Sequence, residues 1–295
     1  MSRNFLTGEE LSPAELGKLL ERAAELKADR PGQGAGALAG RSVALVFEKP
    51  STRTRVSFEV GVAELGGTPI VLRGDELQLS RGESVGDTAR VLSRYVAGIA
   101  IRSGSDAAVR ELGDAAEVPV INALTPAHHP CQALADLLTL RERFGGLDGL
   151  RVAYVGDGNN VARSLALVGA AAGVEVVVSS PPGYELADGG SAVELIADPA
   201  EAVAGCDAIY ADVWVSMGDE EEADARREAL APYRIDAELL DRAADRAVVL
   251  HCLPAHPGEE ITADVLYGDR SAVWDQAENR LHAQKALLEL LVGSE

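Results

Sequence analysis

The sequence predicts an α/β protein with two doubly wound parallel-sheet domains linked by helices. Short, continuous apolar runs alternate with longer amphipathic segments along the whole chain. A strand that is buried on both faces of a parallel sheet is apolar throughout, so this alternation is typical of such a sheet covered by helices. A glycine pair, Gly145-Gly146, also divides the 295 residues into two halves that can each bury a core.

Eight apolar runs predict the strands. In the first half they are Val43–Phe47, Ile70–Leu72, Ile99–Ile101 and Val118–Ile121. In the second half they are Val152–Val155, Val174–Val178, Ala208–Tyr210 and Val248–Leu250.

Three longer segments predict helices that matter for the organisation. The segment after Pro50, "STRTRVSFEVGVAELGG", places apolar residues on one helical face and ends at a glycine pair. A second helix, residues 132–144, lies between the two halves, and a third covers about residues 277–292. We expect a first domain of residues 1–146 that the C-terminal helix (about 277–295) rejoins, and a second domain of residues 147–276. The acidic run "GDEEEADARREA" is expected to be a solvated helix or loop face.

The charge balance limits the classes of partner. With 27 basic and 47 acidic residues the formal net charge is −20, which disfavours nucleic acid and anionic membranes. No apolar run is long enough to span a bilayer, the N-terminus lacks a signal-peptide profile, and three cysteines cannot form a disulfide framework. We therefore expect a soluble, cytoplasmic protein. Only four of the basic residues are lysine, a bias that fits either a high-salt cytoplasm or a GC-rich genome.

Polar residues follow nearly every predicted strand. They include Arg102 after the third run, Asn122 after the fourth, the "GDGNN" segment after the fifth, Asp212 after the seventh and His251 at the eighth. Ligands bind at the carboxyl ends of the strands in open parallel sheets. The sequence therefore predicts that these residues converge on one site.

The segment "FEKPSTRTR" predicts a phosphate cradle. Ser51 and Thr52 suit the N-cap of a helix whose first amides are unpaired, and Arg53 adds a guanidinium that can bind two phosphate oxygens. The alternative is an ordinary capped helix with solvated arginines. No G-x-x-x-x-G-K-[ST] motif occurs, and Val161 replaces the third glycine of a dinucleotide fingerprint in "GDGNNV". A nucleotide P-loop is therefore excluded, and a dehydrogenase is disfavoured.

A metal site finds little support in the sequence. His251, Cys252 and His256 match no common zinc spacing, so we expect no metal. Cys252 could instead be a covalent nucleophile or a residue that only contacts the substrate.

Six motifs, in order, resemble the carbamoyltransferase family and in detail the ornithine carbamoyltransferases. They are "FEKPSTRTR", "HHPCQALADLLT", "GDGNN", "DVWVSMG", "HCLPAHPGEE" and "WDQAENRLHAQK". The resemblance implies two α/β domains, the first for carbamoyl phosphate and the second for ornithine. It implies transfer of a carbamoyl group to the δ-amine of L-ornithine, giving L-citrulline and phosphate, in arginine biosynthesis or, in reverse, in arginine breakdown. It also implies a homotrimer or a multiple of trimers and no cofactor.

The same resemblance assigns residues to substrates. Those for carbamoyl phosphate are Ser51, Thr52, Arg53, Thr54, Gln78, Arg102, His129, Pro130, Cys131, Gln132, Cys252, Leu253 and Arg280. Those for ornithine are Asn160, Asp212, Ser216 and Met217. Arg102, His129, Cys252 and Arg280 are the expected catalytic residues. Gln78 is expected to act across a subunit interface, and the loop with Ser216 and Met217 to close over ornithine.

The chemistry needs donors for a developing oxyanion and an uncharged amine. Arg102, His129, Thr54 and Arg280 could serve as the donors. Asp212 and Cys252 could orient the amine, and no residue is an obvious general base. Amine attack on carbamoyl phosphate needs no acyl-enzyme, so we favour this contact role of Cys252 over a covalent one. The leaving phosphate could accept the proton.

Rival functions remain to be separated. Aspartate carbamoyltransferases share the phosphate motif, but their equivalent of the Gln78 loop carries a serine-lysine arrangement and they lack the Ser-Met-Gly element found in this sequence. Putrescine-type enzymes also lack that element. A non-catalytic relative would be expected to lose Arg53, His129, Asp212 or Arg280, and all four are present. Pro257 stands where relatives often have arginine, and the span from Ser180 to Cys206 is short for the family. Neither change touches the matched site residues.

Overall fold

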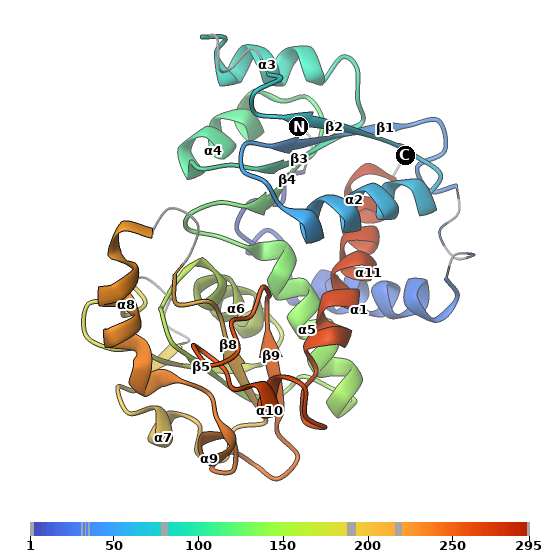
Figure 1. Cartoon of the computed structure of the whole chain (residues 1–295). Coiled ribbons are helices and arrows are strands. Elements are labelled where there is room, and N and C mark those ends of the chain that lie inside the picture. Colours follow the sequence, from blue (N-terminus) through green and yellow to red (C-terminus); the bar gives the residue numbers. More distant parts are fainter. Residues whose placement is uncertain are drawn as a thin grey trace. The chain divides into compact units, whose positions relative to one another are not determined.

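The computed structural model describes residues 3–77, 82–187, 193–215 and 220–293, apart from 31, 33 and 35. The chain forms two compact units (Figure 1). One comprises Met1–Leu138 and Glu278–Glu295, and the other comprises Thr139–Ala277. Two helices, α5 (Pro130–Phe144) and α11 (Val273–Val292), contribute residues to both units.

The first unit contains a four-stranded parallel sheet with the order β2-β1-β3-β4. Its strands are β1 (Ser42–Phe47), β2 (Thr68–Arg73), β3 (Gly98–Arg102) and β4 (Val120–Leu124). All four were predicted, but β4 begins two residues later than expected. Pro119 precedes it, and a proline has no N–H to donate to a sheet ladder.

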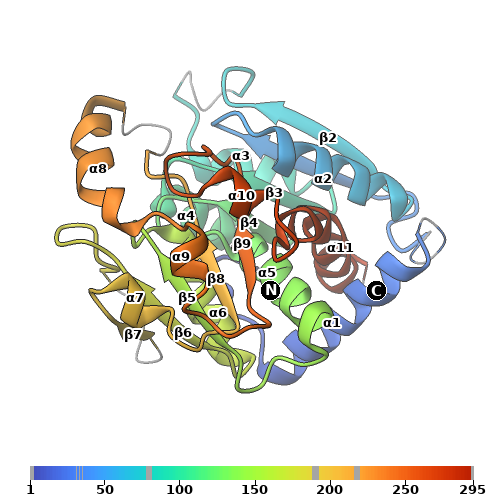
Figure 2. The ribbon, with the colours of Figure 1, turned by 60° about the horizontal axis from the view of Figure 1, so that its bottom comes forward.

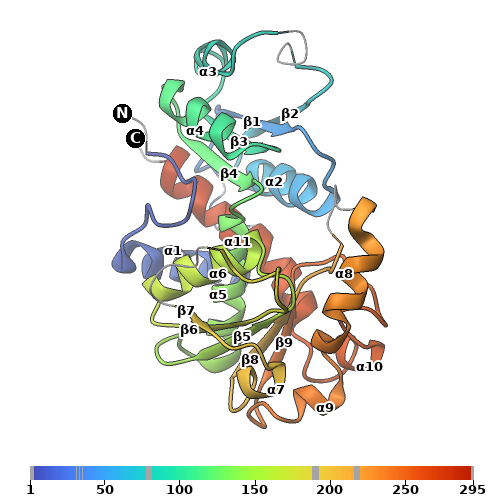
Figure 3. The same ribbon diagram turned by 90° about the vertical axis from the view of Figure 1, so that its left-hand side faces the viewer.

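Helices cover both faces of this sheet, as Figure 3 shows. On one face lies α2 (Thr52–Glu64), and Phe58, Val62 and Leu65 are fully buried, as the helical pattern predicted. On the other face α3 (Val85–Leu92) and α4 (Asp106–Ala115) pack against alternate strand residues such as Ala44 and Val46. The unit also contains α1 (Pro13–Ala28), whose N-terminus is closed by a capping box.

The second unit contains a five-stranded parallel sheet with the order β7-β6-β5-β8-β9. Its strands are β5 (Arg151–Val155), β6 (Glu175–Ser179), β7 (Val193–Leu195), β8 (Ala208–Ala211) and β9 (Val248–His251). Strand β7 was not predicted. It has only three residues, two of them exposed, so it carries no apolar run.

Helices again cover both faces (Figures 2 and 3). On one face lies α6 (Asn160–Ala171). The opposite face is buried by segments around α7 (Pro199–Ala202), α9 (Ala237–Leu240) and α10 (Ala263–Leu266). The described part of the acidic run forms a 3-10 segment (Glu220–Glu222) and most of α8 (Ala223–Leu230). The predicted fold class, two parallel-sheet α/β domains, is confirmed. None of the described helices combines the length and apolar character that a bilayer span requires.

Candidate active site

The start of α2 is open to an anion. Ser51 occupies the N-cap with extended backbone, but its side chain makes no capping bond. The N-cap serines of α1, α3 and α4 (Ser12, Ser84 and Ser105) all accept one from their helix. The first turn of α2 contains no acidic residue, and Thr52 and Arg53 are exposed. The local geometry thus favours a bound anion at this helix start.

Arg280 connects three segments of the first unit that are distant in sequence. Its Nη2 donates to Thr54 Oγ1 at 2.7 Å, and its Nη1 donates to Gln132 Oε1 at 2.7 Å. The Gln132 amide in turn donates to Asp136 Oδ1 at 2.8 Å. Arg280 is 4% exposed, so this guanidinium is fixed in orientation before any ligand arrives.

His129 lies among cations. Its pKa is held well below the usual value of 6.5, first by burial and then by the charges of Arg280, Arg102 and Arg53. The imidazole is therefore neutral at physiological pH and can serve as a hydrogen-bond partner without adding charge. The structure thus brings together four residues that the sequence analysis assigned to carbamoyl phosphate.

The residues after His129 begin α5 inside the core. Pro130, Cys131 and Gln132 are buried. The Cys131 thiol donates to the Asn122 carbonyl at 3.4 Å, and burial raises its pKa to about 12. Its side chain is therefore inert, and a contribution of Cys131 to a ligand would come from its main chain.

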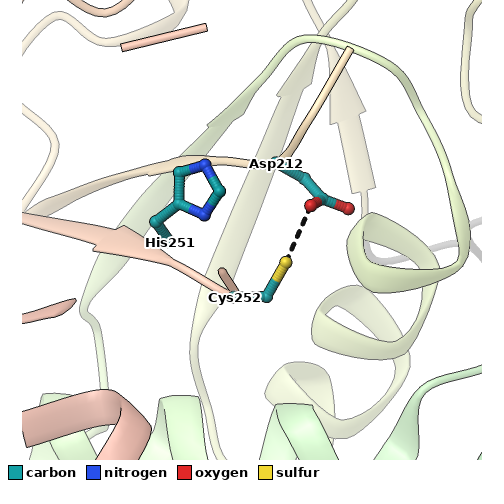
Figure 4. A group of neighbouring side chains, drawn as sticks. All are labelled: Asp212, His251 and Cys252. Carbon is teal, nitrogen blue, oxygen red and sulfur yellow. Dashed lines mark hydrogen bonds between the residues drawn. The ribbon is translucent and has the colours of Figure 1, made fainter. Parts of the chain in front are cut away.

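In the second unit Asp212 accepts three hydrogen bonds. Oδ1 accepts from the Cys252 thiol at 2.8 Å, as Figure 4 shows, and from the Val213 amide at 2.8 Å. Oδ2 accepts from Asn159 Nδ2 at 2.7 Å. A carboxylate offers about four acceptor positions. Asp212 is 8% exposed and keeps one position on Oδ2 for another donor.

Asn159 was assigned to no substrate in the sequence analysis, although its neighbour Asn160 was. Asn159 is the N-cap of α6, and its Oδ1 accepts from the amides of Val161 and Ala162 while also accepting from Tyr154. These bonds orient its amide nitrogen toward Asp212. Asn160 is the first residue of α6 and is half-buried.

His251 supports the segment that carries Cys252 and Leu253. Its Nδ1 accepts from the Leu253 amide at 2.8 Å, so its other nitrogen carries the hydrogen that is shared with Glu260 Oε1 at 3.1 Å. Leu253 has a φ of 59°, which residues other than glycine rarely adopt. The hydrogen bond from its amide to His251 helps to hold this conformation.

Asp212, His251 and Cys252 lie close enough to one another to be considered as metal ligands (Figure 4). Both nitrogens of His251 are occupied by the bonds to Leu253 and Glu260, and the Cys252 thiol donates to Asp212. An imidazole needs a free lone pair to bind a metal. These three residues therefore do not fit a metal in this arrangement.

The two glycines of "GDGNN" meet needs of the backbone. Gly156 has a φ of 131°, and a Cβ on Gly158 would lie 2.4 Å from the backbone nitrogen of Leu186. Gly158 also donates to the Tyr184 carbonyl at 2.8 Å. The positive φ of Gly156 and the close approach at Gly158 thus explain both glycines without a dinucleotide.

Three predicted site residues, Gln78, Ser216 and Met217, lie outside the described residues. Conversely, no role was assigned in the sequence analysis to Asn159, Glu260 or Arg226. Asn159 and Glu260 stand inside motifs that were recognised, whereas Arg226 lies in the acidic run that was expected to be solvated. Arg226 is in fact only 8% exposed, so that expectation is wrong for this residue.

Family models match both parts of the chain. The carbamoyl-phosphate-binding domain of aspartate/ornithine carbamoyltransferases matches residues 3–142, and their aspartate/ornithine-binding domain matches residues 148–291. The chain belongs to the aspartate/ornithine carbamoyltransferase family.

Individual relatives of this family are similar over their full length. A protein named ornithine carbamoyltransferase from Acidothermus cellulolyticus is 57% identical over 100% of this chain and 98% of its own. The solved ornithine carbamoyltransferase from Pyrococcus furiosus is 47% identical, with a TM-score of 0.94, over 100% of this chain and 98% of that one. The solved ornithine carbamoyltransferase from Thermus thermophilus is 44% identical, with a TM-score of 0.92, over 99% of both chains.

Proposed function

We propose that this member of the carbamoyltransferase family transfers the carbamoyl group of carbamoyl phosphate to the δ-amine of L-ornithine, giving L-citrulline and phosphate. The observation that carries an amine acceptor is Asp212, a buried carboxylate with one acceptor position left for an amine. Among amines, the full-length similarity to ornithine carbamoyltransferases favours ornithine.

The first unit supplies the donor site. The amides and hydroxyls at the start of α2, with Arg53, bind the phosphate. Arg280 and Arg102 approach the carbamoyl group beside the neutral His129. The phosphate of the substrate is anionic, and the cluster of three guanidiniums complements it.

Attack of the amine on the carbonyl carbon forms a C–N bond and gives a tetrahedral species with a negatively charged oxygen. That species collapses by breaking the bond to the phosphate oxygen. Fixed donors stabilise the oxyanion because they need no reorganisation, and one such donor contributes about 3–4 kcal/mol. Arg280, already anchored to Thr54 and Gln132, meets this requirement. The departing phosphate accepts the proton that the attacking amine loses.

The second unit supplies the acceptor site. Asp212 accepts a hydrogen bond from the δ-amine and so orients the lone pair of its nitrogen, while Cys252 and Leu253 border the reacting nitrogen. An aspartate acceptor would place a carboxylate near Asp212, which like-charge repulsion disfavours.

Further parts of the proposal concern residues and assembly beyond the described geometry. Ser216, Met217 and Asn160 recognise the α-amino-acid end of ornithine. Gln78 reaches carbamoyl phosphate in a neighbouring subunit of a homotrimer. The first domain, about residues 1–146 with the C-terminal helix, binds carbamoyl phosphate, and residues 147–276 bind ornithine. The enzyme acts in the cytoplasm.

The test is a parallel assay of ornithine, aspartate and putrescine with carbamoyl phosphate. We expect citrulline to form, with kcat/KM for ornithine far above the other two. A preference for aspartate or putrescine would refute the proposal. The absence of any carbamoylated product from folded protein would favour the non-catalytic alternative.

A further inference from the structure

Arg226 lies in the second unit, within the acidic segment, and is nevertheless buried. Its Nε donates to the Trp214 carbonyl at 2.7 Å, and its Nη2 forms an ion pair with Asp157. Its guanidinium also lies over the Tyr184 ring, 5.0 Å from the centroid. One side chain thus contacts the connections that follow three strands, β5, β6 and β8.

These contacts close a ring of interactions around the proposed ornithine site. Asp157 lies two residues before Asn159, and Trp214 lies two residues after Asp212. Asn159 and Asp212 are joined directly by the 2.7 Å hydrogen bond. Arg226 joins the other ends of the same two short segments.

A guanidinium is suited to this place in the ring. Its planar fork can bond a carboxylate and a carbonyl while it stacks on an aromatic ring. The Tyr184 residue on which Arg226 lies is itself tied to the β5–α6 loop, because its carbonyl accepts from the Gly158 amide. Lysine offers a point charge and cannot make all three contacts.

We propose that Arg226 is a positioning residue for the amine acceptor, fixing the Asn159–Asp212 pair in the geometry that receives the δ-nitrogen. Arg226 acts through Asp157 and the Trp214 main chain. The inference rests on the proposed function, because its readout is the use of ornithine.

The neighbouring Arg227 provides a matched control. It is on the same short helix, one residue further, with a side chain that is 45% exposed. Its contacts include ion pairs with Asp224 and Glu259 at the surface. Removing Arg227 changes the charge of α8 to the same extent but leaves the contacts of Arg226 with Asp157 and Trp214 in place.

The experiment compares the parent with Arg226→Ala, Arg226→Lys, Asp157→Asn and Arg227→Ala by steady-state kinetics in both substrates. We expect Arg226→Ala to lower kcat/KM for ornithine by about 10²-fold, the scale of a misplacement of about 1 Å. KM for carbamoyl phosphate should change by less than about threefold. Arg226→Lys should recover only part of the loss, and Arg227→Ala should resemble the parent.

Two results would overturn the inference. One is an Arg226→Ala enzyme with the ornithine kinetics of the parent. The other is an equal loss in both substrates, which would mark a general structural role. If Arg226→Ala does not fold, Asp157→Asn and Arg226→Lys carry the same test, because each breaks one side of the ring more mildly. A parent enzyme that does not carbamoylate ornithine would instead refute the proposed function itself.

Discussion

The buried ion pair between Lys285 of α11 and Glu64 of α2 allows a detailed prediction about stability. Lys285 is completely buried, and its Nζ donates to Glu64 Oε2 at 2.8 Å. Glu64 also accepts from Arg30 at 2.8 Å, and its side chain is 14% exposed. Burial raises the pKa of Glu64, but the bonds from Lys285 and Arg30 outweigh it, and the net shift is downward. Lys285 therefore has its carboxylate partner in a fully buried position, whereas Glu64 has a second cationic partner, Arg30, and some contact with water.

This difference between the two residues predicts which single substitution lowers the free energy of unfolding more. Glu64→Leu leaves a fully buried ammonium without its carboxylate, which costs about 3–5 kcal/mol of unfolding free energy. Lys285→Met leaves Glu64 with Arg30 and partial contact with water, so the loss should be about 1–3 kcal/mol. The double variant removes both charges and should lie within about 2 kcal/mol of the parent, because an apolar pair of similar size often replaces a buried ion pair without loss.

The parent and the three variants are unfolded in urea at one protein concentration. If the dependence of the unfolding free energy on urea concentration is the same in all four, a change in the urea midpoint reports a change in stability. Because α2 packs on α11 through Gly61, whose Cβ would lie 3.3 Å from Lys285 Cγ, the methionine stem fills the same space. A larger loss for Lys285→Met than for Glu64→Leu, or losses that simply add in the double variant, would refute this reasoning.

Three further predictions concern the phosphate site, pH and salt. Arg53→Ala should raise KM for carbamoyl phosphate by about 10- to 10²-fold, which corresponds to the loss of one charge-assisted hydrogen bond of about 1.5–3 kcal/mol. Arg55→Ala, which removes a surface ion pair with Glu59, should leave this KM unchanged. Equal KM values for the two variants would contradict the phosphate cradle. His129 has a folded pKa well below 6.5, so the unfolded chain binds more protons and stability should fall as pH drops below about 6.5, by at most about 1.4 kcal/mol per pH unit. His129→Gln should make that slope smaller without abolishing it, because burial also lowers the pKa of His282; urea unfolding between pH 5 and 7.5 measures the difference, and an unchanged slope would contradict the prediction. Screening of the net charge of −20 should raise the melting temperature between 0.1 and 2 M KCl, and an unchanged melting temperature would favour codon bias as the origin of the acidity.

Much of this site was predictable because its residues follow apolar strands that are easy to recognise. The carboxyl ends of β1, β3 and β4 bring Thr54, Arg102 and His129 to the same edge of one sheet, and the alternation of strands and helices is sufficient to predict this. The spacing within a motif cannot show which of two adjacent asparagines points inward. Asn159 points toward Asp212 because its side-chain oxygen caps the start of α6, and this leaves its side-chain nitrogen facing Asp212.

Other features depend on tertiary partners that no local pattern encodes. Arg226 has the sequence surroundings of a solvated residue, yet Asp157, Trp214 and Tyr184 bury it. Strand β7 pairs with β6 at only three positions and lacks an apolar run. In both cases the structure is set by contacts between segments separated by many residues, so a reading of neighbouring residues could not find them.

The proposed acceptor site contains a conflict that predicts a pH dependence. A carboxylate such as Asp212 favours an ammonium ion, but only the neutral amine can attack, and free alkylammonium groups have a pKa near 10. Asp212 already accepts from Cys252, Val213 and Asn159. These donors compensate part of its charge, which weakens its preference for the ammonium form over the amine. Because the proposed site orients the amine and leaves deprotonation of the ammonium ion to solvent, kcat/KM for ornithine should rise about tenfold per pH unit between pH 6 and 8, following the fraction of neutral amine. Asn159→Ala, which removes one compensating donor, should lower kcat/KM while keeping that slope. A parent profile that is flat over this range would mean that the enzyme itself removes the proton, and the role assigned to Asp212 would have to be abandoned.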